Sequence, residues 1–311
     1  MDSLSVCAGI DAGSYESKLA YSDELSTRII AKLEGFDLRG LREECEAFFD
    51  EPVFSCVVAS DQRVRSEGTG FDDVYVIAQS EAAILGLGRD GKSVVYDLGA
   101  SGCRMYALNS REVMESVKVD DVCGNMFDAE FAEYLAERYG FEKVDLRDAR
   151  RIKHELTNEE STVWHELRIY RYELERIIHF PVKRTARVLQ RLCRVYKPEG
   201  VILTGGSVKI PEVWKVLAEV SGITPEYRGN LFVEGAALKA RELQKGSRPT
   251  GRKIDTAAKI RELRAGMLAL EDKLTRRQKD RVYALFRQAE GINDAGIIAL
   301  MEGLIREIKG A

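Results

Sequence analysis

Two glycine-containing turns, each following an aspartate at the end of an apolar run, are the features of the sequence with the clearest chemical potential. They lie at residues 9–15 (GIDAGSY) and 95–102 (VYDLGASG). Backbone N–H groups in such turns point inward and form an anion cradle, and Gly13 would allow close approach to a phosphate. Alone, each pattern is more typical of a plain hairpin turn. If the two turns face each other across a cleft, they could clamp a polyphosphate, and Asp11 and Asp97 could hold a hydrated Mg²⁺.

A third pattern, at residues 201–211 (VILTGGSVKIP), combines an apolar strand, a double glycine and a helix start marked by proline. Two glycines at a strand-to-helix turn permit a flat ring to lie directly against the backbone, where side chains would obstruct it. A tight structural turn is the alternative interpretation. The pattern therefore predicts either a site for a planar group or a simple connection between a strand and a helix.

These turns need strands and helices to hold them, and the hydrophobic spacing predicts two similar sets of elements. The first set comprises a helix at 38–50 and strands at 4–11, 16–22, 27–33 and 53–59. The second set comprises a helix at 127–139 and strands at 93–97, 104–108 and 112–119. Both sets open with an aspartate-containing glycine hairpin and continue as three strands and a helix. This repetition predicts a duplicated, two-lobed fold.

The remaining segments predict further α/β structure and a separate tail. A strand and a helix are expected at 74–77 and 81–87, mainly helical structure at 144–198, a strand at 201–204, and helices at 210–220 and 233–245. Residues 247–253 (SRPTGRK) have no large apolar side chain, which favours a linker. The tail at 254–311 has three amphipathic stretches with plausible N-caps, so we expect a helical element there.

Composition indicates a globular cytoplasmic protein. The chain has 311 residues, of which 45% are hydrophobic and 32% are charged, a content compatible with about two domains. No apolar run suits a signal peptide or a membrane span, so no membrane partner is expected. The residues after 246 carry 14 Lys/Arg against 9 Asp/Glu, but without interleaved aromatic residues, which disfavours a nucleic-acid surface. The six cysteines are scattered and predict small buried hydrophobes rather than a zinc site or disulfides.

In their order and spacing, the three turn patterns resemble the phosphate-1, phosphate-2 and adenosine motifs of the actin, sugar-kinase and heat-shock-chaperone superfamily. The nucleotide-binding domain of the 70-kDa heat-shock chaperones is the branch that fits best. Residues 79–83 (QSEAA) and 234–237 (EGAA) are similar to its two connecting helices. Residues 123–128 (CGNMFD) resemble its glycine-rich turn before a helix, and residues 152–157 (IKHELT) resemble its adenosine-contacting helix. The resemblance covers about residues 5 to 245.

This resemblance implies an α/β, two-lobed ribonuclease-H-like (actin-like ATPase) fold with duplicated β-β-β-α units. The nucleotide-binding domain would be residues 1–246, with lobe I at about 1–92 and lobe II at about 93–246. The linker at 247–253 would lead into the tail at 254–311, which resembles the helical lid of chaperones.

The resemblance also implies that ATP or ADP binds between the lobes with Mg²⁺. Asp11 and Asp97 would hold the metal, and together with Gln79 they are the catalytic candidates. The other candidate nucleotide-binding residues are Gly13, Ser14, Tyr15, Gly99, Ala100, Ser101, Gly102, Gly124, Lys153, His154, Thr157, Gly205, Gly206, Ser207 and Lys209.

Several positions depart from the family pattern. Gln79 stands where the family has a catalytic acidic residue, and Gly102 where a threonine hydroxyl follows the phosphate-2 glycines. Between residues 33 and 53 there is room for a single helix, so the inserted subdomain with its phosphate-directed lysine is missing. A glutamine can still orient an attacking water, which predicts slow hydrolysis at best.

The leading functional hypothesis is therefore an ATP/ADP-binding, chaperone-like switch with weak ATPase activity, read by a partner or client protein. A nucleotide-binding scaffold that does not hydrolyse ATP is the simpler alternative, because of the departures at Gln79 and Gly102. An actin-like filament protein and a small-molecule kinase of the same fold are the further alternatives. A filament would scatter light in a concentration-dependent way, and a kinase would need a base near the γ-phosphate.

Overall fold

The structure is a computed structural model that describes residues 6–22, 26–35, 37–49, 53–60, 70–71, 73–110 and 112–246, together with Lys279 and Val282. The chain divides into two compact units, Met1–Gly246 and Ser247–Ala311. The strands and helices described below belong to the first unit. The expected linker at 247–253 lies outside the described residues, as does the expected helical tail apart from Lys279 and Val282.

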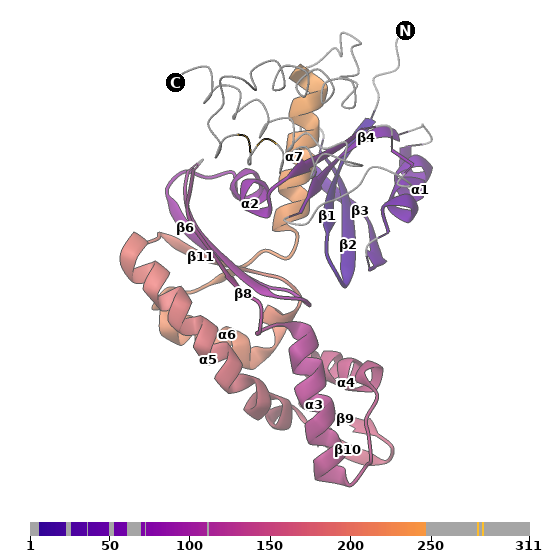
Figure 1. Cartoon of the computed structure of the whole chain (residues 1–311), viewed down its shortest axis with the longest axis vertical. Helices are drawn as coiled ribbons and strands as arrows, with labels where there is room; N and C mark the ends of the chain where they lie inside the picture. The colour runs from indigo at the N-terminus through magenta and orange to yellow at the C-terminus, as the bar shows by residue number, and fades with distance from the viewer. Residues whose placement is uncertain are drawn as a thin grey trace. The chain divides into compact units, whose positions relative to one another are not determined.

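The first sheet has five strands in the order β3-β2-β1-β4-β5 (Figure 1). Strand β1 pairs antiparallel with β2 and parallel with β4, β2 pairs antiparallel with β3, and β4 pairs parallel with β5. The sheet is therefore mixed, and β1 is its central strand. Its strands are β1 (Val6–Ala12), β2 (Glu16–Ser22), β3 (Thr27–Glu34), β4 (Val53–Ala59) and β5 (Asp73–Ile77).

The second sheet has the order β12-β11-β6-β7-β8. Its strands are β6 (Lys92–Leu98), β7 (Cys103–Asn109), β8 (Glu112–Val119), β11 (Gly200–Thr204) and β12 (Glu226–Tyr227). Strand β7 pairs antiparallel with β6 and with β8, whereas β11 pairs parallel with β6 and with β12. Both sheets are thus mixed, with a central strand flanked by an antiparallel pair on one side and a parallel pair on the other. The fold is α/β, and the origin of the two sheets by duplication stays a prediction.

The helices lie between and outside the sheets. They are α1 (Leu38–Phe49), α2 (Gln79–Leu87), α3 (Gly124–Tyr139), α4 (Leu146–Asn158), α5 (Arg171–Tyr196), α6 (Pro211–Ser221) and α7 (Leu231–Gly246), with a 3-10 turn at Ser207–Lys209. Local signals explain their ends. The Cys123 sulfur accepts a hydrogen bond from the Met126 amide at the start of α3, and Gly140 ends that helix in a left-handed conformation.

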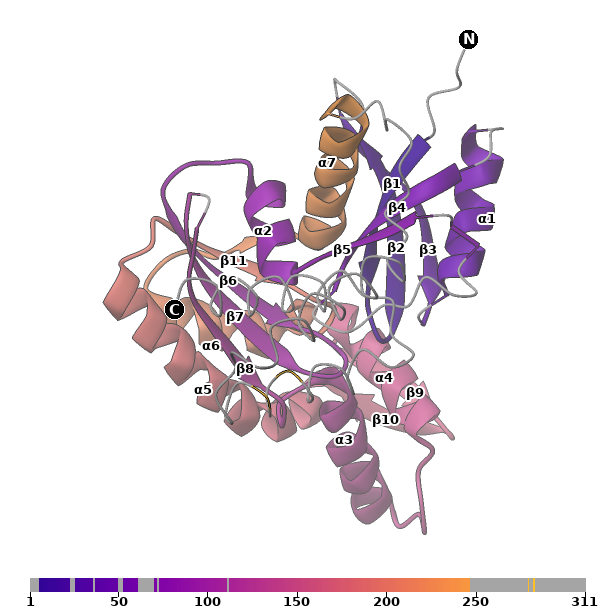
Figure 2. The ribbon, with the colours of Figure 1, turned by 45° about the horizontal axis from the view of Figure 1, so that its top comes forward.

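Two helices, α2 and α7, separate the sheets (Figures 1 and 2). One buried cluster joins apolar residues of both sheets to these helices, including Val57, Val95 and Phe232. Small residues let the helices approach closely, because a Cβ added at Gly235 would lie 1.9 Å from the Ala82 carbonyl oxygen. Helix α7 also packs on β1, β2 and β4. Helix α7 therefore returns to the first sheet after the chain has completed the second.

The outer faces of the sheets carry separate cores. Helix α1 covers the first sheet through the cluster that contains Leu41 and Ile10. Helices α3 to α6 contribute to the larger cluster on the second sheet, around Phe127 and Leu189. The six cysteines are free, and all but Cys193 are buried, as expected for small apolar side chains. Among the described residues, no helix is both long and apolar enough to cross a membrane.

The expectation of mainly helical structure at residues 144–198 is confirmed, but the region also contains strands that the sequence did not predict. Within residues 144–198, helices α4 and α5 are separated by a two-stranded ribbon of β9 (Ser161–Trp164) and β10 (Leu167–Tyr170). The turn of this ribbon is formed by His165 and Glu166, both with positive φ angles, 46° and 65°. Neither is glycine or asparagine, so the residues that normally mark such a turn are absent from the sequence.

Candidate functional site

A cavity of about 590 Å³ lies where the ends of β1 and β6 meet helix α4 and the segments before α7. Its volume falls within the range of small-molecule sites. The structure brings together every candidate residue selected from the sequence, since all of them line this cavity. They are Asp11, Gly13, Ser14, Tyr15, Gln79, Asp97, Gly99, Ala100, Ser101, Gly102, Gly124, Lys153, His154, Thr157, Gly205, Gly206, Ser207 and Lys209.

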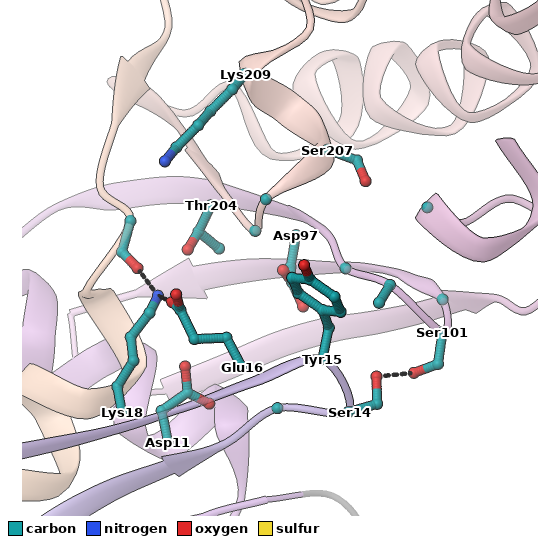
Figure 3. Close-up of a pocket in the computed structure, with 18 of the residues that line it drawn as sticks. Asp11, Ser14, Tyr15, Glu16, Lys18, Asp97, Ser101, Thr204, Ser207 and Lys209 are labelled. Carbon is teal, nitrogen blue, oxygen red and sulfur yellow. Dashed lines mark hydrogen bonds and ion pairs between the residues drawn. The ribbon is translucent and has the colours of Figure 1, made fainter. Parts of the chain in front are cut away.

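The first loop, residues 12–15, connects β1 to β2. A Cβ at Gly13 would lie 2.2 Å from the Glu16 carbonyl oxygen, so this tight turn accepts only glycine. The Ser14 hydroxyl donates a hydrogen bond to the Ser101 hydroxyl at 3.1 Å. Figure 3 shows these two side chains pointing toward each other. The loops of the two sheets therefore meet at one side of the cavity.

The second loop, residues 99–102, connects β6 to β7 and is fixed by the start of α3. The Gly99 amide donates to the Gly102 carbonyl at 2.9 Å, which closes the loop. The amides of Gly124 and Asn125 donate to the carbonyls of Gly99 and Ala100 at 2.9 and 2.8 Å. Because these loop carbonyls are bound by the start of α3, the loop has a defined shape before any ligand arrives.

The double-glycine loop, residues 204–209, connects β11 to the helical segment before α6. Gly205 has a φ of +90°, and a Cβ there would lie 2.4 Å from the Leu98 carbonyl oxygen. At Gly206 an added Cβ would meet nothing within 4 Å. The two glycines therefore differ in what they contribute. The backbone conformation and close packing require glycine at position 205, whereas Gly206 leaves open space beside the cavity.

Two carboxylates, Asp11 and Asp97, lie at equivalent positions of the central strands β1 and β6. Burial raises the pKa of Asp11 from 3.8 to about 6, and the charge of Lys18 opposes this rise. Asp97 is buried, with 6% of its surface exposed, whereas Asp11 is partly exposed. The described residues contain no group of three or more His, Cys, Asp or Glu side chains that could hold a metal ion. Carboxylate oxygens such as those of Asp11 and Asp97 are ligands that Mg²⁺ accepts.

Helix α4 contributes a buried charge network to another wall of the cavity. The Asp128 carboxylate, from α3, lies 2.5 Å from the Lys153 amine and 2.7 Å from the Arg150 Nε. Lys153 also donates to the Gly124 carbonyl at 3.1 Å. Burial lowers the pKa of Lys153, although Asp128 favours its charged form. One carboxylate thus fixes two basic side chains at the edge of the cavity.

Tyr15 of the first loop packs against this helix. The Arg150 guanidinium carbon lies 5.2 Å from the centre of the Tyr15 ring, a cation–π contact. The Tyr15 ring also meets the His154 ring edge-on, with centroids 5.8 Å apart. Burial, and then the charge of Lys153, lower the pKa of His154, which favours its neutral form. Thr157 donates its hydroxyl to the Lys153 carbonyl one turn earlier.

Gln79 is the first residue of α2 and is 7% exposed. Its amide oxygen accepts hydrogen bonds from the Arg104 guanidinium at 3.1 Å and from the Tyr106 hydroxyl at 3.5 Å. The carbonyl of this side chain is therefore engaged within the protein. Its side chain lines the cavity, and the sequence did not predict the contact with Arg104.

Several residues that line the cavity were not among the candidates predicted from the sequence: Glu16, Lys18, Lys32, Arg104, Asn125, Asp128, Arg150, Thr204, Tyr227 and Gly229. A signal existed for two of them. Lys18 and Arg104 each follow the aspartate of their own hairpin by seven residues, a shared spacing of two basic residues. Asp128 and Arg150 carry no comparable signal, because their pairing joins two helices that are distant in sequence.

Comparison with known proteins adds a family relationship. A chaperone protein HscA homolog of Paracidovorax citrulli is 26% identical over 269 residues, covering 73% of this chain and 42% of that protein. The HscA homolog of Rickettsia africae is 31% identical, and the match covers 61% of this chain and 35% of that protein. The HscA homolog of Rickettsia prowazekii is 30% identical, and the match covers 75% of this chain and 44% of that protein. Over part of its length, the chain is thus similar in sequence to HscA chaperones.

HscA belongs to the Hsp70 family of chaperones, so the similarity supports the Hsp70 and actin-like ATPase relationship at family level. The chain spans less than half the length of these HscA relatives. No protein-family model matches the chain.

Proposed function

We propose that this protein is an ATP/ADP-binding, chaperone-like switch that holds a nucleotide with Mg²⁺ in the cavity between its two sheets. One observation carries the proposal: residues from three separate sequence patterns and from α4 converge on one cavity of suitable volume. The names of the HscA relatives support a chaperone-like role.

The lining fits a nucleoside polyphosphate. The first and second loops offer backbone amides and the Ser14 and Ser101 hydroxyls to phosphates. Asp11 and Asp97 are the carboxylates for Mg²⁺, which binds the phosphates as well. The nucleoside would lie between α4, with Lys153, His154 and Thr157, and the double-glycine loop with Ser207 and Lys209.

A switch needs contacts that differ between nucleotide states, and contacts of this kind cross the cavity. Among them are the Ser14–Ser101 hydrogen bond and the cation–π contact of Arg150 with Tyr15. A bound polyphosphate would bridge the same loops and strengthen the closed arrangement. A partner or client protein in the cytoplasm would read the change.

Slow hydrolysis is the expected chemistry. Gln79 would orient the attacking water through its amide, as glutamine does in other phosphoryl-transfer sites. The hydrogen bonds from Arg104 and Tyr106 to its oxygen hold the side chain at the cavity wall but also engage its acceptor. This engagement favours, as the second candidate function, a nucleotide-binding scaffold that does not hydrolyse ATP.

The matching strand orders of the two sheets support the proposed ribonuclease-H-like, actin-like ATPase architecture with duplicated units. The proposed domain boundaries are a nucleotide-binding domain at 1–246, a linker at 247–253 and a lid-like tail at 254–311. Since α7 packs on β1, β2 and β4, the last part of lobe II would contact lobe I directly.

Calorimetric titration of ATP and ADP with Mg²⁺ tests nucleotide binding. The wild type is expected to bind both, and the Asp11→Asn plus Asp97→Asn variant neither. Asp121→Asn is the matched control, because its side chain is 68% exposed and pairs with Arg184 instead of lining the cavity. No binding to the wild type would overturn the proposal.

A phosphate-release assay on the same wild-type protein separates the two candidate functions. Slow release that is lost in the double aspartate variant supports the switch. Tight binding of ATP without any release supports the scaffold.

A further inference from the structure

The long helix α5 presents a strongly basic face to solvent. Residues 176–196 of this helix include six Lys/Arg and no Asp or Glu. Exposed residues at alternating spacings of four and three form a line along the helix, here called the basic ridge: Arg176, Phe180, Lys183, Arg187, Gln190 and Arg194. Helix α5 lies on the outer side of the second sheet, away from α2 and α7 (Figure 1). The basic ridge is therefore separate from the proposed nucleotide cavity, which none of its residues lines.

The cations of the basic ridge lack acidic partners. Within the part of the chain that the structure describes, Arg176, Lys183, Arg187 and Arg194 form no ion pair. Lys183 and Arg187 are four positions apart and therefore neighbours on the helix, where like charges are destabilising. No acidic residue follows Glu175 in α5 to offset this repulsion. The ridge is therefore a row of charge that an acidic partner would neutralise.

Carboxylates already occupy the arginines that flank the basic ridge. The Arg191 guanidinium binds the Glu115 carboxylate of β8 through both of its terminal nitrogens, at 2.5 and 3.2 Å. Arg184 pairs with Asp121, just after β8, at 2.7 Å. Arginine recognises a carboxylate in this two-pronged way because its planar fork of donors matches the two oxygens. This face of α5 therefore binds carboxylates wherever the fold supplies them.

Apolar surface lies at two points along the basic ridge. The Phe180 side chain is 78% exposed, the largest exposed fraction among the large apolar side chains that the structure describes. Arg194 lines a hollow of about 370 Å³ whose walls include Pro198, Val220 and Ile223. Phe180 precedes Arg194 by 14 residues, which is about 21 Å of helix. An extended segment of about eight residues spans that distance.

We propose that the basic ridge and the hollow bind an acidic segment of a partner protein, an extended stretch with an apolar side chain at each end. Carboxylates of this segment pair with Lys183 and Arg187. One apolar side chain packs on Phe180, and the other enters the hollow beside Arg194. Because the ridge lies outside the nucleotide cavity, this inference goes beyond the proposed function and can fail without it.

A nucleic-acid surface and a merely solvated helix face are the competing explanations. Proteins bind single-stranded nucleic acid by stacking successive bases on several aromatic side chains, whereas the basic ridge has one, Phe180. A nucleic-acid duplex would be held through its phosphates and would make no use of the apolar hollow. A solvated face would bind neither kind of ligand. The explanations therefore differ in which ligand binds and in whether Phe180 contributes.

The experiment is fluorescence anisotropy of a labelled peptide, six glutamates flanked by two leucines, titrated with the full chain at low salt. Two matched peptides replace the glutamates with glutamines or the leucines with serines, and each should bind about fivefold more weakly or worse. Lys183→Gln plus Arg187→Gln should weaken binding of the leucine-flanked acidic peptide by about tenfold or more. Arg147→Gln on α4, with a side chain 92% exposed, is the matched control and should bind as the wild type does. Thermal melting checks folding, and the double variant should melt no lower than the wild type because like charges are removed.

Phe180→Ser tests the apolar contact without disturbing the core, because its side chain is 78% exposed. It should weaken binding of the leucine-flanked acidic peptide by about threefold or more and leave the serine-flanked peptide unchanged. Ile223→Thr should have the same effect from the hollow. The proposal is overturned if the wild type does not bind the leucine-flanked acidic peptide, or if the double variant binds it equally well. Tighter binding of a single-stranded or duplex DNA oligonucleotide would overturn it in favour of a nucleic-acid surface.

Discussion

The Ser14 hydroxyl of the first loop donates a hydrogen bond to the Ser101 hydroxyl of the second loop at 3.1 Å, although 87 residues separate the two in sequence. Both side chains are exposed at the rim of the cavity. The bond adds little to the stability of the fold, since exposed polar contacts are weak. Its position between the two loops that we propose bind phosphates makes it a contact that a bound phosphate would replace or reinforce.

Replacing Ser14 with alanine should therefore affect ligand binding more than folding. We expect the free energy of unfolding to change by less than about 0.5 kcal/mol. The affinity for Mg²⁺-ATP should fall by about 2- to 10-fold, because one hydroxyl donor to the phosphates is lost. Ser116→Ala, exposed on β8, is the control for a serine away from the cavity. A large drop in melting temperature with unchanged affinity would contradict this expectation.

Asp11→Asn should stabilise the ligand-free protein at neutral pH. Burial raises the pKa of Asp11 from 3.8 to about 6, so between these values the folded state binds more protons than the unfolded state. Stability must then fall as the pH rises through this window, and the cost is fully present above pH 6. Removing the charge should recover up to about 3 kcal/mol at pH 7. Urea unfolding at pH 4 and pH 7 measures the effect.

The pH dependence supplies the control for this prediction. At pH 4 the Asp11 carboxyl is largely protonated in the folded protein, so the asparagine variant and the wild type should have nearly equal stabilities. Equal stabilities at pH 7 as well would show that Asp11 is better solvated than its burial indicates.

Gly205 and Gly206 should respond differently to alanine. Gly205 has a φ of +90° and a Cβ there would approach the Leu98 carbonyl to 2.4 Å, so Gly205→Ala should destabilise the fold by about 1–3 kcal/mol or more. Gly206→Ala meets open space and should leave the melting temperature almost unchanged. If a nucleoside lies beside this loop, Gly206→Ala should still weaken nucleotide binding. Thermal melting and calorimetry on the pair would test both statements, and similar melting temperatures would contradict the first.

Asp128→Asn should be among the most damaging single changes at the cavity. It removes the carboxylate that lies 2.5 Å from Lys153 and 2.7 Å from Arg150, and leaves the buried lysine charge without its partner. Breaking one partner of a buried ion pair costs about 3–5 kcal/mol. Asp148→Asn on α4 is the control, because its ion pair with Arg151 is 40% exposed at the aspartate and should contribute little. Chemical denaturation of the two variants compares the costs, and equal values would refute the expectation.

The strands and turns that form the cavity were predictable because their signals are local. Alternating or continuous apolar runs predicted β1, β2, β6 and β7, and an aspartate followed by glycine predicted the hairpin at the end of each central strand. The double glycine before Ser207 likewise marks a turn wherever it occurs. The ribbon of β9 and β10 was missed because His165 and Glu166 adopt positive φ angles without the usual turn residues.

Residue type and the spacing within one hairpin are enough to indicate which residues could bind an anion, a metal and a flat ring. Tertiary packing brings these hairpins to one cavity, pairs Asp128 with Lys153 and Arg150, and places Lys18 and Arg104 beside the two aspartates. Strand register and the packing of α3 against α4 set these pairings. Both depend on contacts between segments far apart in the chain, where hydrophobic burial and strand pairing act together and no local pattern records the result.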